Sequence, residues 1–204
     1  MYEYVRGELV AVNPLYIVVD VQGIGYQIFT ANPFRFSSLM NQEVRVYVYQ
    51  AVREDNMTLY GFKDEYEKQL YLKLISVSGI GPKSGLTILA NGDYQGLIRA
   101  IEAEDVRYLT KFPGVGKKTA SQIILDLKGK LADLVDPTYS ASEEQVSLNL
   151  SEEDQFMKET EEALKGLGYS TRDIGRVMPV LEKEGPFEST EVALRTAFKL
   201  LLKS

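Results

Sequence analysis

The segment Phe112–Ser121, FPGVGKKTAS, contains the residue types that proteins use to hold phosphate groups. Two glycines precede two lysines and a hydroxyl side chain: Gly114, Gly116, Lys117, Lys118 and Thr119. A nucleotide-binding P-loop follows a strand and places a glycine five residues before a Gly-Lys-Ser/Thr triplet. Here Lys111 stands at that position, the triplet is absent, and the preceding DVRYLTKF has helical apolar spacing. The segment therefore does not fit an ATP-binding P-loop.

The same pattern occurs a second time, 35 residues earlier in the chain. YLKLISVSGIGPKSGLTIL (Tyr71–Leu89) aligns with DVRYLTKFPGVGKKTASQII. The aligned pairs are Leu74 with Leu109, Gly79 with Gly114, Gly81 with Gly116, Lys83 with Lys118, and Ser84 with Thr119. Each copy predicts a helix, a Gly-apolar-Gly hairpin and a second helix. Gly79-Ile80-Gly81 also resembles a dinucleotide fingerprint, but Ser84 replaces its third glycine and no strand precedes it.

Two such hairpins suit a nucleic-acid backbone. Glycines permit a tight turn and a close approach of phosphate to the main chain. The free N–H groups and positive dipole end of the second helix then attract the anion. Because nothing in this arrangement contacts a base, we expect binding independent of sequence. The predicted DNA-binding residues are Gly79, Gly81, Lys83, Ser84, Gly114, Gly116, Lys117, Lys118 and Thr119. The alternative is a plain helical hairpin with glycine turns.

The composition narrows the possible classes of function. The 204 residues contain no Cys and no His, so thiolate metal sites, disulfides and histidine-based catalysis are excluded. The absence of Cys suits a cytoplasmic location, and no apolar run long enough to span a membrane is present. The net charge of −6 arises entirely from residues 136–204, because 15 basic residues balance 15 acidic ones before them. The overall acidity therefore does not argue against nucleic-acid binding by residues 1–135.

The chain is predicted to be an α+β multidomain protein. In residues 1–63 the alternation of YIVVDVQGIGYQIFT, with a break at Gly23-Ile24-Gly25, and of EVRVYVYQAV predicts an OB-type β-barrel. Residues 64–135 form the tandem helix-hairpin-helix domain, opened by an Asp64–Glu67 capping box and joined by a helix that Asp93 caps. Barrel aromatics either stack on unpaired bases or only fill the core.

The last third of the chain is predicted to be a linker and a small helical domain. Residues 136–150, DPTYSASEEQVSLNL, lose periodicity and gain Ser, Glu and Pro, which is typical of a flexible linker. Residues 151–204 predict a UBA-like bundle of three helices, the first capped by Ser151 with Asp154 and the second by Ser170 with Asp173. An acidic, tethered bundle is suited to docking a protein partner. The alternative is a passive stabilising cap.

Taken together, these features resemble the RuvA family, the Holliday-junction-recognition subunits of the bacterial branch-migration machinery. The resemblance rests on RGELVAVNPLYIVVDVQGIGYQI, VREDNMTLYGF, the hairpins SGIGPKSG and PGVGKKTA, and ALKGLGY, so it covers essentially the whole chain. It implies a non-catalytic, cofactor-free homotetramer that holds a four-way DNA junction open, with one or two tetramers per junction. It also implies recruitment of the hexameric ATPase RuvB by the C-terminal bundle, and contact with the RuvC resolvase.

The resemblance also assigns roles to residues. Glu54 and Asp55 fall where the family has an acidic turn at the tetramer centre, whose carboxylates repel the phosphates of the crossover. Leu164, Leu167 and Tyr169 are nominated for contact with RuvB. The competing hypotheses are an ordinary solvent-exposed turn, a carboxylate-metal nuclease that uses Glu54, Asp55 and Asp64, and a single-strand binder.

Overall fold

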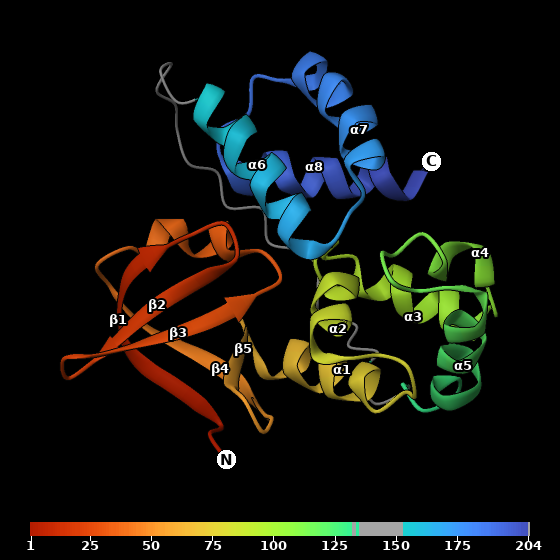
Figure 1. Cartoon of the computed structure of the whole chain (residues 1–204), viewed down its shortest axis with the longest axis horizontal. Coiled ribbons are helices and arrows are strands. Elements are labelled where there is room, and N and C mark those ends of the chain that lie inside the picture. Colours follow the sequence, from red (N-terminus) through yellow and green to blue (C-terminus); the bar gives the residue numbers. More distant parts are fainter. Residues whose placement is uncertain (132–133, 135–152, 204) are drawn as a thin grey trace.

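The computed structural model describes residues 1–131, 134 and 153–203, with the side chains of 153–155 and 203 left out. Three structural units follow one another along the chain (Figure 1). The barrel and the helix-hairpin-helix domain lie side by side, and the C-terminal bundle lies across both of them. This α+β architecture confirms the predicted fold class. The predicted linker of residues 136–150 lies outside the described residues.

Five strands close the N-terminal barrel: β1 (Tyr4–Val12), β2 (Tyr16–Val21), β3 (Ile24–Thr30), β4 (Glu43–Val52) and β5 (Met57–Phe62). Their order around the barrel is β1-β2-β3-β5-β4, and β4 pairs with β1 to complete the closure. Only the β3–β5 pair is parallel, because the 3-10 helix η1 (Pro33–Leu39) carries the chain across the barrel between β3 and β4. Val44, Val46 and Val48 face the core, as their alternation predicted.

The β2–β3 turn corrects one detail of the sequence-based prediction. The chain reverses at Gln22 and Gly23, with φ values of 54° and 87°, whereas Ile24 and Gly25 already belong to β3. Two consecutive positive φ values are what a tight hairpin turn between antiparallel strands requires. The break at Gly23-Ile24-Gly25 was therefore placed too late in the chain, because glycine spacing alone does not say which residues carry positive φ.

The helix-hairpin-helix domain consists of α1 (Glu65–Ile75), α2 (Pro82–Leu89), α3 (Tyr94–Glu102), α4 (Val106–Leu109) and α5 (Lys117–Leu127). Asp64 accepts a hydrogen bond from the Glu67 N–H at 2.8 Å, and Asp93 accepts one from the Gly96 N–H at 2.7 Å. Both predicted N-caps are thereby confirmed. The Glu67 side chain, however, does not only serve a capping box at the start of α1. It extends into the interface with the barrel, where it binds Arg35 and Tyr94.

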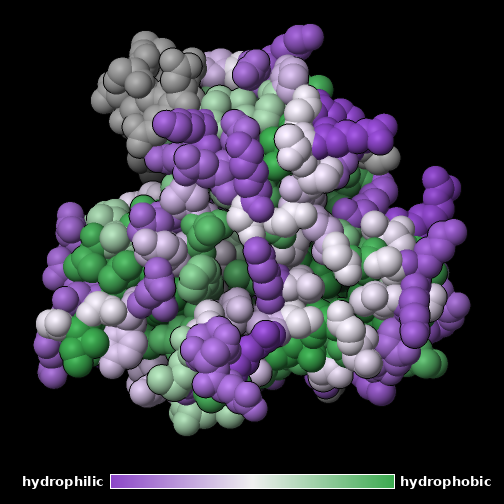
Figure 2. All heavy atoms as spheres, viewed as in Figure 1, coloured by the Kyte–Doolittle hydropathy of each residue, from purple (hydrophilic) through white to green (hydrophobic). Residues whose placement is uncertain are grey.

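The C-terminal bundle consists of α6 (Glu153–Leu167), α7 (Thr171–Glu184) and α8 (Thr190–Lys203). Ser170 accepts a hydrogen bond from the Asp173 N–H at 3.1 Å, which confirms the cap predicted for the second helix. The Ser151–Asp154 cap lies outside the described residues and side chains. Figure 2 shows hydrophilic side chains over the visible surfaces of α6 and α7. The bundle's fully buried apolar residues include Leu164, Leu181, Leu194 and Phe198.

Aromatic side chains join the barrel to α1. Tyr71 of α1 is fully buried, and its ring lies 4.6 Å from that of Phe62, 5.6 Å from Tyr49 and 6.0 Å from Tyr60, measured between centroids. Its hydroxyl donates to the carbonyl of Pro82, the first residue of α2, at 3.1 Å, so the same side chain also holds the start of α2. These barrel aromatics therefore pack against the helical domain, as the core-filling alternative predicted.

A buried polar network reinforces the same boundary. The Glu67 carboxylate is 1% exposed and accepts hydrogen bonds from the Arg35 guanidinium of η1 and, at 2.5 Å, from the Tyr94 hydroxyl of α3. The Lys63 N–H donates to it at 2.8 Å. Burial opposes the charge on Arg35, but the adjacent carboxylate outweighs this effect and raises the pKa of the guanidinium. Burial, and then Glu67, raise the pKa of Tyr94 well above 10.

We expect Glu67→Ala to lower the free energy of unfolding by about 3–5 kcal/mol, because it leaves the Arg35 charge buried without its partner. The control is Glu43→Ala, which breaks the Arg6–Glu43 pair on the open surface of the barrel, where both side chains are more than half exposed. Urea unfolding followed by circular dichroism measures both changes. Equal midpoint shifts in the two variants would show that the Glu67 network contributes no more than a surface pair.

Candidate nucleic-acid interface

The first hairpin, residues 76–81, connects α1 to α2 and is held by its own apolar residue. Gly79 has a φ of 92°, which favours glycine, and Ile80 is buried, with its N–H donating to the Val77 carbonyl at 3.1 Å. Gly81 is the N-cap of α2 and is exposed. The buried apolar residue between the two glycines therefore anchors a turn whose glycines face outward.

The second hairpin, residues 110–116, repeats this geometry before α5. Gly114 has a φ of 77°, and Val115 is buried, with its N–H donating to the Phe112 carbonyl at 3.1 Å. Gly116 is the N-cap of α5, with φ −81° and ψ 174°, close to the −85° and 169° of Gly81. The repeat detected in the sequence thus corresponds to two turns of the same conformation.

Both hairpins present the start of a helix to the outside. Neither α2 nor α5 has a side-chain N-cap, and a Cβ built on Gly81 or Gly116 meets no atom within 4 Å. Lys83, Lys117 and Lys118 are exposed there and, within the described part of the chain, form no ion pair with a carboxylate. Free N–H groups, a positive dipole end and unpaired ammonium groups together form an anion-binding surface.

The fold brings the two hairpins together in a reciprocal arrangement. A Cβ built on Gly79 would lie 3.8 Å from the Thr119 hydroxyl of α5, and one built on Gly114 would lie 3.7 Å from the Ser84 hydroxyl of α2. Each first glycine therefore lies beside the second helix of the other motif. The nine predicted DNA-binding residues consequently belong to one continuous surface, which the sequence repeat by itself could not establish.

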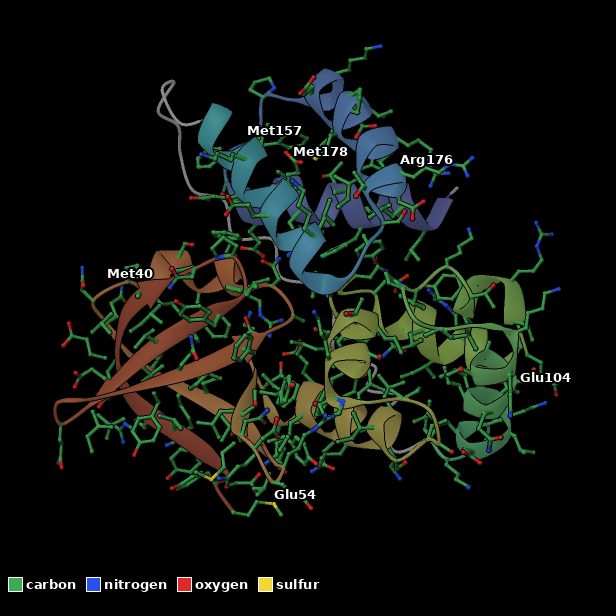
Figure 3. The ribbon with its side chains drawn as sticks, in the orientation of Figure 1. Met40, Glu54, Glu104, Met157, Arg176 and Met178 are labelled. Carbon is green, nitrogen blue, oxygen red and sulfur yellow. The ribbon has the colours of Figure 1, made fainter. Side chains whose placement is uncertain are left out.

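The acidic turn, residues 53–56, connects β4 to β5. The Arg53 N–H donates to the Asn56 carbonyl at 2.9 Å, and all four side chains are exposed. Figure 3 places Glu54 at the tip of this hairpin, on the side of the barrel away from the C-terminal bundle. Val52 and Met57 flank the turn and are 66% and 72% exposed, so the tip has an apolar base on both strands.

The carboxylates proposed for the nuclease alternative do not form a cluster. Asp64 caps α1, where its side chain accepts from the Glu67 N–H, while Glu54 and Asp55 project from the β4–β5 turn. Among the residues that the structure describes, no group of three or more acidic side chains is arranged to hold a metal ion. A two-metal nuclease needs such convergence. Nothing in the described geometry therefore supports this alternative.

The three residues nominated for contact with a partner protein are buried. Leu164 is fully buried, and Leu167 and Tyr169 are 8% and 7% exposed. The Leu167 carbonyl accepts a hydrogen bond from the Thr87 hydroxyl of α2 at 2.9 Å. Thr87 was not among the predicted functional residues, because at the sequence level it is an ordinary threonine in a helix.

The comparisons with known proteins identify the family. Three family models match successive parts of the chain: the RuvA N-terminal domain at residues 1–61, the SAM-like helix-hairpin-helix tandem at 71–130, and the RuvA C-terminal domain at 156–202. The Holliday junction branch migration complex subunit RuvA of Latilactobacillus sakei is 50% identical over 203 residues, which cover 100% of both chains. The chain belongs to the RuvA family.

Two further RuvA relatives show that the similarity spans the whole molecule. The subunit of Limosilactobacillus reuteri is 51% identical over 202 residues, covering 98% of this chain and 100% of the relative. That of Listeria innocua is 51% identical over 205 residues, covering 100% of both. The tandem helix-hairpin-helix match coincides with the two hairpins described above, which makes this part of the RuvA fold a DNA-binding domain. No helix in the described residues is long and apolar enough to cross a membrane.

The two glycines of one hairpin have different structural roles, which predicts different costs of substitution. Gly114→Ala should lower the free energy of unfolding by about 1–2 kcal/mol, because the left-handed conformation disfavours a side chain. Gly116→Ala should cost less, because its φ of −81° is ordinary and its Cβ would enter open space, so only the preference for glycine over alanine at an N-cap opposes it. Thermal and urea unfolding of both variants measure the difference. Equal losses at the two positions would contradict this description of the hairpin.

Proposed function

We propose that this chain is the structure-specific, non-catalytic DNA-binding subunit of a branch-migration complex. It holds a four-way junction open through the DNA backbone, whatever the base sequence. The observation that carries the proposal is the paired, uncapped helix starts at Gly81 and Gly116, with Lys83, Lys117 and Lys118 beside them. The names of the RuvA relatives, which describe subunits of a Holliday junction complex, support the same substrate.

The geometry of this surface supports phosphate binding. A phosphate that approaches either hairpin meets main-chain N–H groups, one or two ammonium groups and the hydroxyl of Ser84 or Thr119. Since the two hairpins lie beside each other, one subunit would hold two phosphates on neighbouring parts of an arm. Four arms meet at a junction, so we propose four subunits per junction face, as a homotetramer, and a second tetramer on the opposite face in some complexes.

The remaining roles are assigned by domain. We propose that residues 1–63 place Glu54 and Asp55 at the crossover, where their charges keep phosphates of exchanging strands apart. Residues 64–135 bind the arms, and residues 151–204 recruit and stimulate the RuvB ATPase. Leu167 and Tyr169 are our remaining candidates for contact with RuvB, and RuvC is a further candidate partner. Leu164 is fully buried in the bundle core and offers no surface to a partner, which corrects its nomination.

The second hairpin is tested by reversing one of its charges. Lys118→Glu should weaken binding to a four-way junction by roughly tenfold at 0.1 M salt, and should reduce the salt slope by about one. The loss should be the same for junctions of different sequence, because the contact is to the backbone. Gel-shift titrations at several salt concentrations measure both quantities.

Lys158→Glu is the matched control, because it makes the same charge change at an exposed position on α6, in another domain. Junction binding by this variant should remain close to that of the unmodified chain. If both variants lost affinity equally, the effect would come from net charge, and the second hairpin would not belong to the DNA interface.

The acidic turn is tested by removing its charges while keeping its shape. The double variant Glu54→Gln/Asp55→Asn should bind junctions as tightly as the unmodified chain or more tightly, because repulsion between carboxylates and phosphates is lost. It should also discriminate less against ordinary duplex and change the rate of branch migration with RuvB. An ordinary exposed turn would leave affinity, discrimination and rate unchanged, and that result would remove the turn from the mechanism.

A further inference from the structure

The end of α6 is packed tightly against the other two domains. The Thr87 hydroxyl of α2 donates to the Leu167 carbonyl at 2.9 Å, and Thr87 is only 1% exposed. Gly166, one residue earlier, contacts the β1–β2 turn, where a Cβ built on Gly166 would lie 1.8 Å from Leu15 Cδ2 and 2.9 Å from Leu15 Cγ. Any side chain at Gly166 would therefore force Leu15 to move, and a large one would press this end of the bundle away from the barrel.

The bundle's last helix makes a second set of contacts on the same side. α8 packs against η1 of the barrel, and the Lys111 ammonium donates to the Leu202 carbonyl. Lys111 belongs to the second hairpin, directly after α4, and Thr87 lies in the helix that follows the first hairpin. The bundle thus touches the second hairpin itself and the helix that follows the first, in the position that Figure 1 shows above the barrel and α2.

This contact is more polar than the interior of a domain. A small cavity between the three domains is lined by Asn32 and Arg35 of the barrel, Asn91 after α2, and Glu191 and Arg195 of α8. Asn32 Oδ1 and Arg35 Nε are buried there and have no hydrogen-bond partner among the described protein atoms. Polar interfaces between domains of one chain resemble those of transient complexes, and relative motion of the domains is the ordinary expectation for them.

The docked position covers the end of α6, where Leu167 is one of the residues proposed to contact RuvB. Leu167 is nearly buried and its main chain is bonded to Thr87, whereas Tyr169 packs against Phe198 within the bundle itself. A protein that binds the end of α6 would have to occupy the space that Leu15 and Thr87 occupy here.

We propose that the end of α6, at Gly166 and Leu167, is an interaction surface with two alternative occupants: the body of this chain and the motor ATPase. Docking of the bundle on Leu15 and Thr87 excludes the motor, and release of the bundle exposes the surface that recruits it. This inference rests on the proposed function of the bundle and adds its regulation. The apparent affinity for the motor is then the intrinsic affinity multiplied by the fraction of molecules in which the bundle is released.

A disulfide that locks the docked position tests the proposal in the full-length chain. The chain contains no Cys, so Leu15→Cys/Gly166→Cys introduces a single pair. A Cβ built on Gly166 lies 2.9 Å from Leu15 Cγ, and the Leu15 Cβ is bonded to that Cγ. The two Cβ atoms can therefore reach the separation of about 3.5–4.5 Å that disulfides require. Each single cysteine variant serves as a control for the substitution itself.

The readouts are junction binding by gel shift and stimulation of RuvB ATPase activity on junction DNA, before and after reduction. The oxidised double variant should bind junctions normally but lose stimulation by about tenfold or more, and dithiothreitol should restore it. Equal stimulation in the oxidised and reduced states would overturn the proposal. Failure of the disulfide to form, judged by free-thiol titration, would also overturn it, since the docked position would then not be populated.

An opening variant tests the opposite direction. Gly166→Leu should release the bundle and strengthen motor binding, by about tenfold if one tenth of the unmodified molecules are released. Gly175→Leu is the matched control, because a Cβ at this exposed position on α7 meets no atom within 4 Å. Unchanged motor affinity in a folded Gly166→Leu variant would contradict the exclusion. If neither the unmodified chain nor any reduced variant stimulated RuvB, the proposed function of the bundle would fail, independently of the lock.

Discussion

The buried Glu67 carboxylate is the contact on which the relative placement of the barrel and the hairpins depends. It accepts hydrogen bonds from Arg35 of the barrel, Tyr94 of α3 and the Lys63 main chain at the end of β5. A charge buried in this way must keep its partners, because an unpaired charge in the protein interior is very costly. The network therefore ties the acidic turn, at the far end of β4, to helices that carry the DNA-binding surface. The stacked ring of Tyr71 adds apolar contact at the same boundary.

Within the helical domain, the two motifs act as one unit. Each hairpin has a buried apolar residue between two glycines, and each first glycine lies beside the hydroxyl of the opposite motif. This reciprocity keeps the two helix starts at a fixed separation, which suits a regularly spaced phosphate backbone better than two independent turns. It also explains why a small hydroxyl residue suits both equivalent positions, Ser84 and Thr119, since a larger side chain would press on the neighbouring turn.

The sequence by itself determined the local elements and the family. Apolar periodicity, the caps at Asp64, Asp93 and Ser170, and the repeated Gly-x-Gly-x-Lys pattern are short-range signals, and each describes residues only a few positions apart. They predicted the barrel, both hairpins and the bundle, and their order along the chain pointed to RuvA. They erred at Gln22-Gly23, because the positive φ of a non-glycine residue leaves no clear mark in the sequence.

Only the tertiary structure decided how these elements meet. The partners in Arg35–Glu67–Tyr94, Thr87–Leu167 and Leu15–Gly166 are separated by up to 151 positions in the chain, and none of these residues is unusual in its local context. The structure likewise showed that Tyr49, Tyr60 and Phe62 of the barrel pack against Tyr71 and that Leu167 and Tyr169 are buried. Periodicity tells which face of a helix is apolar, but not which surface covers it. That choice depends on shape and hydrogen-bond complementarity between distant segments, and such complementarity exists only once the chain has folded.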